Sequence, residues 1–129
     1  MKLIKQRNGV DCGLAVAAML SGQPYDFAAE ADPNPDSERG LSPGDLVYTL
    51  EGLTGEPFYE TRKGKGKPFS VYGLPKSPCA ILIRESQKSF GHWIATDGAL
   101  VFDPESETPV SLNKYPRRDW PILRIIETD

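Results

Sequence analysis

Residues 91–103 read Gly-His-Trp-Ile-Ala-Thr-Asp-Gly-Ala-Leu-Val-Phe-Asp. Two apolar, β-rich runs flank an Asp-Gly pair, which is a strong short-range signal for a β-hairpin. With a two-residue turn, Thr96 faces Ala99. In the same register His92 lies directly opposite Asp103, with Cβ atoms about 5 Å apart. His92 is the only histidine of the chain, and an imidazole beside a carboxylate is an oriented general base.

A candidate nucleophile lies near the start of the chain, where residues 11–20 read Asp-Cys-Gly-Leu-Ala-Val-Ala-Ala-Met-Leu. Apolar residues recur at helical spacing from Cys12 onward, and the side chain of Asp11 is suited to cap this helix. Cys12 then lies in the first turn, where free N–H groups and the helix dipole favour a thiolate. An isolated cysteine at this spacing is more often a core residue. The hairpin base, and Gly13 beside the sulfur, favour the nucleophile.

Gln6 precedes the cysteine by six residues and supplies a further group that acyl transfer needs. Its side-chain amide and the Cys12 backbone N–H are candidates for an oxyanion hole. In this scheme Cys12 attacks a carbonyl carbon, and His92 protonates the leaving group and then activates water. Asp103 holds the imidazole in the correct tautomer. The sequence therefore predicts a thiol hydrolase that needs no cofactor.

The motif residues resemble those of one family: Gln6, Asp11-Cys12-Gly13-Leu14-Ala15, Met19, His92-Trp93-Ile94 and Asp103-Pro104. They are similar to the bacteriocin-processing, double-glycine leader peptidases, which are papain-like cysteine peptidases. The resemblance implies that Cys12 is the nucleophile, His92 the general base and acid, Asp103 the orienter and Gln6 the oxyanion donor. It also implies a peptide or protein substrate, and a helical lobe with the cysteine packed on an antiparallel sheet with the histidine.

The order of the predicted elements indicates one α+β domain over residues 1–129. The helical part, about 1–55, contains the cysteine helix, ended by Gly22, and a second helix over 42–51 with Ser42 as its N-cap and Gly52 beyond its end. The sheet part, about 56–129, is strand-rich. Strands are expected over 58–61, 79–84, the hairpin 92–103 and 122–127.

Charge and hydropathy limit the partners. The net charge of −3 gives no overall drive toward nucleic acid or an acidic membrane. No apolar run approaches the about 18 residues that a transmembrane helix needs. The basic start of the chain imitates a signal peptide, but cleavage after Gly22 would remove Cys12. We therefore expect a cytoplasmic protein that binds neither nucleic acid nor membrane. The oligomeric state stays open, with a monomer favoured.

The second cysteine of the chain is assigned a structural role. Cys79 begins an apolar strand and is interpreted as a buried strand residue, although a Cys12–Cys79 disulfide would leave no free thiol. A single histidine and two distant cysteines give no credible structural zinc site. The aromatic residues Trp93, Tyr115 and Trp120 either line a cleft or pack in the core.

Three other functions stay open from the sequence alone. A related thiol amidase or deamidase can use the same order of cysteine and histidine. A papain-like shell without catalysis can serve as a binding module or as an inhibitor of a host protein. Nucleic-acid binding through the basic, glycine-rich loop 62–67 is a third option, although a solvated loop is the simpler interpretation.

Overall fold

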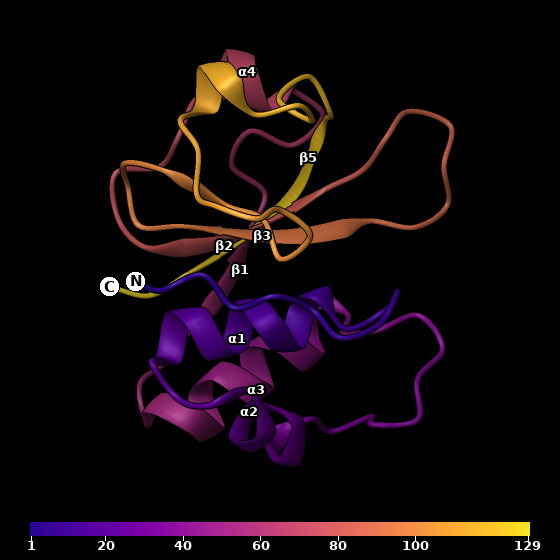
Figure 1. The fold of residues 1–129 in the computed structure, drawn as a ribbon, viewed down its shortest axis with the longest axis vertical. Helices are drawn as coiled ribbons and strands as arrows, with labels where there is room; N and C mark the ends of the chain where they lie inside the picture. Colours follow the sequence, from indigo (N-terminus) through magenta and orange to yellow (C-terminus); the bar gives the residue numbers. More distant parts are fainter.

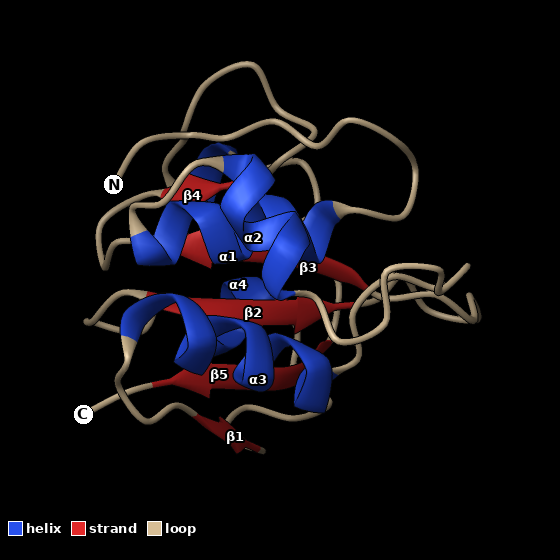
Figure 2. Cartoon of the chain, turned by 90° about the horizontal axis from the view of Figure 1, so that it is seen from below, coloured by secondary structure: helices blue, strands red, loops and turns tan.

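Helices cover one face of a single β-sheet in the computed structural model, which describes residues 1–129 (Figure 1). The elements are, in chain order, α1 (Cys12–Ser21), α2 (Tyr25–Ala31), α3 (Pro43–Thr54), β1 (Tyr59–Thr61), α4 (Phe69–Tyr72), β2 (Cys79–Ile83), β3 (His92–Thr96), β4 (Val101–Phe102), the 3-10 turn η1 (Leu112–Lys114) and β5 (Ile122–Glu127). The sheet has five antiparallel strands in the order β1-β5-β2-β3-β4. The short helix α4 lies on the opposite face (Figures 1 and 2). The predicted α+β class with an antiparallel sheet is confirmed.

Apolar clusters on both faces hold these layers together. Strand β3 alternates between them, since Trp93 packs with the helices and Ile94 packs in the cluster on the opposite face. Tyr115, which follows η1, is also fully buried in that second cluster. The segment between β4 and β5 therefore covers the face of the sheet that the helices leave open.

The hairpin β3–β4 has a different register from the predicted one. Thr96 pairs with Val101, so the connection is the four-residue loop 97–100 and not a two-residue turn. The Asp97 carboxylate accepts hydrogen bonds from the N–H groups of Ala99 and Leu100. These bonds favour the wider loop, because an aspartate that binds backbone amides further along the chain forms a turn of its own.

The predicted pairs of this hairpin, Thr96 with Ala99 and His92 with Asp103, are therefore wrong. The register is displaced by two residues, which would place Asp103 opposite Ile94 if the ladder continued. A displacement of two residues leaves every side chain on its original face, whereas a displacement of one would reverse it. His92 and Asp103 thus stay on the same face as diagonal neighbours, within reach of each other.

The helices agree with the prediction where capping signals are strong. Helix α1 ends at Gly22, whose φ of 72° is left-handed. Helix α3 begins after Ser42 with a capping box in which Ser42 and Asp45 each accept a hydrogen bond from the other's backbone N–H. It continues through Gly52, where an end was predicted, to the left-handed Gly55. Helices α2 and α4 were not predicted. None of the helices has the length and apolar character that crossing a bilayer requires.

Candidate active site

Cys12 is the first residue of α1, and its sulfur faces the start of β3. The Sγ atom accepts a hydrogen bond from the Trp93 backbone N–H at 3.4 Å. The residue is 9% exposed and lies in the wall of a cleft of about 450 Å³. Backbone N–H groups in the first turn of a helix have no helical partner. The sulfur is therefore held by the Trp93 N–H and borders the cleft, near backbone N–H groups of the first helical turn.

His92 and Asp103 form a buried pair. The His92 Nε2 atom lies 2.7 Å from Asp103 Oδ1, and both residues are less than a tenth exposed. This contact leaves Nδ1 as the ring nitrogen available to the thiol. Burial alone would lower the pKa of His92, but its hydrogen bond to Asp103 and the influence of Asp103 and the nearby Cys12 side chain outweigh burial and raise the pKa to about 9. The raised pKa favours the protonated imidazole at neutral pH.

Asp103 collects three further hydrogen bonds. Its carboxylate accepts from the Tyr115 hydroxyl at 2.5 Å, from Arg117 at 3.2 Å and from the Glu105 backbone N–H at 2.8 Å. Burial would raise the pKa of Asp103, but the bonds from His92 and Tyr115 lower it below its ordinary value. Burial and the nearby charge of Asp103 raise the pKa of Tyr115, so its hydroxyl stays protonated and donates. The orienting carboxylate is thus charged and fixed from several sides.

Sequence reasoning did not identify the roles of Tyr115 and Arg117. Arg117 bridges two carboxylates, because it also bonds to Glu105 at 3.0 Å. Glu105 Oε1 in turn lies 3.6 Å from His92 Nδ1 and adds negative charge near the imidazole. Tyr115 and Arg117 follow a proline-rich connection of irregular structure, where no periodic pattern marks which side chains turn inward. The sequence offers no signal for either role.

Gln6 lies beside the segment that carries the orienting carboxylate. Its backbone N–H donates to the Pro104 carbonyl at 3.1 Å. Its side-chain Nε2 donates to the Asn8 carbonyl at 2.7 Å, and Oε1 is buried without a partner. A primary amide carries two protons on nitrogen, so one remains for another acceptor. The structure has no hydrogen bond between Gln6 and Cys12.

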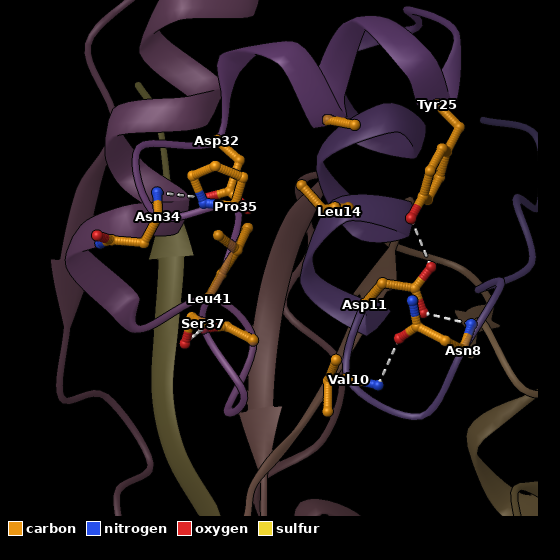
Figure 3. A pocket seen from close by; sticks show the side chains of 12 residues that line it. Asn8, Val10, Asp11, Leu14, Tyr25, Asp32, Asn34, Pro35, Ser37 and Leu41 are labelled. Carbon is orange, nitrogen blue, oxygen red and sulfur yellow. Dashed lines mark hydrogen bonds between the residues drawn. The ribbon is translucent and has the colours of Figure 1, made fainter.

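The predicted capping role of the Asp11 side chain is wrong. Asp11 precedes α1 as its N-cap residue, but φ and ψ of −102° and 21° depart from the extended conformation of a capping residue, and the carboxylate makes no cap bond. It accepts hydrogen bonds from the N–H groups of Arg7 and Asn8 at 2.7 and 2.9 Å, and from the Tyr25 hydroxyl at 2.6 Å (Figure 3). Asp11 thus fixes the loop between Gln6 and the helix, beside a pocket of about 230 Å³.

Both cysteines are free, so the alternative of a Cys12–Cys79 disulfide does not hold. Cys79 is 1% exposed at the start of β2. Burial raises the pKa of the Cys79 thiol to about 12. Cys79 is a core residue, as predicted, and Cys12 is the thiol that borders the cleft.

Two loops form the outer walls of the cleft, and both project beyond the same end of the molecule (Figure 1). One connects α2 to α3 and contributes Arg39 and Leu41. The other connects β2 to β3 and contributes Arg84 and Phe90. Trp93 forms part of the floor, and its Nε1–H donates to the Leu41 carbonyl at 2.9 Å. Of the three aromatic candidates, only Trp93 borders this cleft.

Comparison with known proteins identifies the fold. The structure is similar to the crystal structure of the peptidase domain of Streptococcus mutans ComA, with a TM-score of 0.64 and 20% sequence identity. The match covers 100% of this chain and 99% of that one. The chain has a peptidase-domain fold. No protein-family model matches the sequence, and no curated protein matches it.

Proposed function

We propose that this protein is a cysteine peptidase that hydrolyses peptide bonds with Cys12, His92 and Asp103 as its catalytic triad. One observation carries the proposal: a buried His92 bonds to Asp103 through Nε2, and the Cys12 sulfur accepts a hydrogen bond from the backbone N–H of Trp93, the next residue of β3. The fold shared with the ComA peptidase domain adds support. The closer relationship to the double-glycine leader peptidases rests on the motif residues around Gln6, Cys12 and His92. We place all 129 residues in one catalytic domain.

The first half of the reaction acylates the enzyme. The Cys12 thiolate attacks the peptide carbonyl carbon, and the resulting oxyanion accepts hydrogen bonds from the Cys12 N–H and the free proton of Gln6 Nε2. Each well-placed donor stabilises this charge by about 3 kcal/mol. The protonated His92 transfers the proton on Nδ1 to the leaving nitrogen. The C–N bond then breaks, and a thioester remains on Cys12.

The second half releases the product. Neutral His92 accepts a proton from water, and the hydroxide attacks the thioester carbon. The C–S bond breaks, which restores the thiolate beside a protonated imidazole. Asp103 keeps the proton on Nε2 throughout, so that Nδ1 always faces the sulfur. The mechanism uses a reduced Cys12 and no cofactor, which suits a cytoplasmic setting.

Alkylation kinetics test the activated thiol directly. At pH 6.5, iodoacetamide should label Cys12 at least about 100-fold faster than Cys79, because Cys12 borders the cleft near the base His92 while burial keeps the Cys79 thiol protonated. Peptide mapping by mass spectrometry gives both rates. The His92→Gln variant should lose most of the difference. Equal and slow labelling of both cysteines would instead favour a binding module.

The reaction type is tested with a library of random decapeptides. We expect new amino termini with the wild-type protein and none with Cys12→Ala, measured by mass spectrometry. Release of ammonia from glutamine side chains without backbone cleavage would make the protein a deamidase. Cleavage of cell-wall muropeptides in preference to linear peptides would make it an amidase.

A further inference from the structure

Two cationic side chains line the same cleft as the nucleophile, one from each of its outer loops. Arg39 belongs to the α2–α3 loop and Arg84 follows β2. Neither forms an ion pair, although the chain carries 18 acidic residues. Other arginines do find carboxylates within the molecule: Arg7, Arg117 and Arg124. The two cleft guanidinium groups are therefore available to a ligand.

The acidic residue in the cleft wall does not neutralise these cations. Asp45 is committed to the capping box of α3, where it accepts the Ser42 N–H at 3.3 Å, and it also accepts from Asn34 Nδ2 at 2.9 Å. No ion pair joins it to Arg39 or Arg84. The cleft wall therefore carries two positive groups that no carboxylate of the chain neutralises.

The orientation of Arg39 leaves its donors free. Its guanidinium carbon lies 5.8 Å from the centre of the Phe90 ring, which belongs to the opposite loop. A guanidinium held near an aromatic ring keeps its N–H groups for a planar acceptor such as a carboxylate. The floor beside it is apolar, with Leu82, Trp93 and Leu123. The cleft thus offers both apolar contacts and guanidinium donors to a ligand.

We propose that this cleft binds a carboxylate of the substrate between Arg39 and Arg84. The proposal rests on the peptidase function above and names the substrates that it prefers: peptides with an acidic group at a fixed distance from the bond that Cys12 attacks. Either an aspartate or glutamate side chain or the terminal carboxylate of the peptide supplies the same chemistry.

Cleavage of the random decapeptide library tests this preference. We expect enrichment of a carboxylate at one position relative to the cleaved bond with the wild-type protein. The double variant Arg39→Gln, Arg84→Gln should lose the enrichment and still cleave neutral peptides. On a matched pair of peptides with Glu or Gln at that position, kcat/KM should differ about fivefold to tenfold, and less in 0.5 M KCl because salt screens exposed charges.

Lys88→Gln is the matched control, since it removes an exposed cation from the same loop outside the cleft wall. It should retain the preference. Amidated and free-acid versions of each peptide separate the two sources of the carboxylate. Cleavage without an acidic preference, or a preference that survives in the double variant, would overturn the proposed subsite and leave the peptidase function standing.

A binding measurement tests the proposed subsite separately from the proposed peptidase activity if no peptide is cleaved. Fluorescein-labelled decapeptide pools that contain either Glu or Gln are titrated against the Cys12→Ala protein and monitored by anisotropy. Tighter binding of the Glu pool, lost when Arg39 and Arg84 are also replaced, supports the subsite even without turnover. Equal binding of both pools refutes it.

Discussion

Two buried aspartates, Asp11 and Asp103, each organise a loop beside the site, and the charge of their partners differs. Each accepts a hydrogen bond from a tyrosine hydroxyl, Tyr25 in one case and Tyr115 in the other. The remaining partners of Asp11 are backbone N–H groups. Asp103 also bonds to a backbone N–H, but in addition to His92 and Arg117.

This difference in partners indicates that Asp11 has a structural role and Asp103 a chemical one. A carboxylate with neutral donors fixes a backbone conformation, as Asp11 does for the loop that leads to Cys12. A carboxylate that faces an imidazole also sets the protonation of that ring, as Asp103 does for His92. The comparison predicts that changes near Asp11 alter stability, whereas changes near Asp103 alter the pH dependence of the reaction.

The largest effect should come from the sulfur that lies between the two loops. Cys12→Ala should lower kcat by at least about 10⁵-fold, because removal of a nucleophile abolishes the covalent route. Peptide hydrolysis measures the loss, and thermal unfolding should stay within a few degrees of the wild type. Cys79→Ala, the matched control in β2, should keep its activity. A fully active Cys12→Ala protein would show that neither the loop fixed by Asp11 nor the loop fixed by Asp103 takes part in catalysis.

The second largest effect should come from a substitution at Asp103, compared with the same substitution at Asp11. Asp103→Asn should lower kcat about 10³-fold, since an amide can hold the imidazole in the wrong tautomer. The alkaline limb of the pH–kcat/KM profile, expected near pH 9 where His92 loses its proton, should move toward 6.5. Asp11→Asn should lower the urea concentration at the midpoint of unfolding and leave the alkaline limb of the pH profile unchanged. An equal displacement of the limb in both variants would refute the distinction between them.

Replacement of Gln6, the proposed oxyanion donor, should have the next largest effect. Gln6→Ala should lower kcat about 100-fold with little change in KM, because the amide acts on the charge of the transition state. Steady-state kinetics on one peptide give both constants. Asn8→Ala is a useful comparison, since it removes a neighbouring side chain of the same loop and retains the carbonyl that holds Gln6. Similar losses in the two variants would point to loop distortion.

The two tyrosines give a smaller and more specific contrast. Tyr115→Phe removes a donor to Asp103, so the carboxylate becomes more basic and the alkaline limb should rise by less than one pH unit, with kcat reduced about fivefold. Tyr25→Phe should cost about 1 kcal/mol of unfolding free energy without moving the limb. The pH profile and urea denaturation of both variants test this pair. A displaced limb in Tyr25→Phe would contradict the comparison.

The last effect concerns the dependence of stability on pH. The pKa of His92 rises from 6.5 to about 9 on folding, so its stabilising contribution is fully present below about pH 6.5 and is lost as the pH rises through 9. The difference in unfolding free energy between the wild type and His92→Gln should therefore shrink between pH 6.5 and pH 10. A constant difference would mean that the imidazole pairs with Asp103 without gaining a proton.

Local signals in the sequence predicted the parts of the fold that local physics determines. Gly22 and Ser42 mark helix ends because their backbone conformations and caps depend on near neighbours. Asp97-Gly98 correctly indicated a hairpin, but its register depended on which amides the Asp97 side chain would bind. The predicted side-chain contact between His92 and Asp103 is nevertheless present, because a two-residue displacement preserves the face of a strand.

Long-range contacts could not be predicted in the same way. Tyr115 and Arg117 reach Asp103 only because the irregular segment after β4 folds back over the sheet. The Asp11 carboxylate binds the loop before it and not the helix after it, a choice that depends on Tyr25 from α2. Helix α2 itself is short and follows Pro24, so its periodic signal is weak.

The position of β5 has a consequence for how activity arises. This strand, Ile122–Glu127, pairs with both β1 and β2 and so lies inside the sheet, although both partners are distant from it in the sequence. Contacts between such distant segments form slowly, because the intervening chain must first be ordered. A refolding protein should therefore regain helical circular dichroism well before it cleaves peptides.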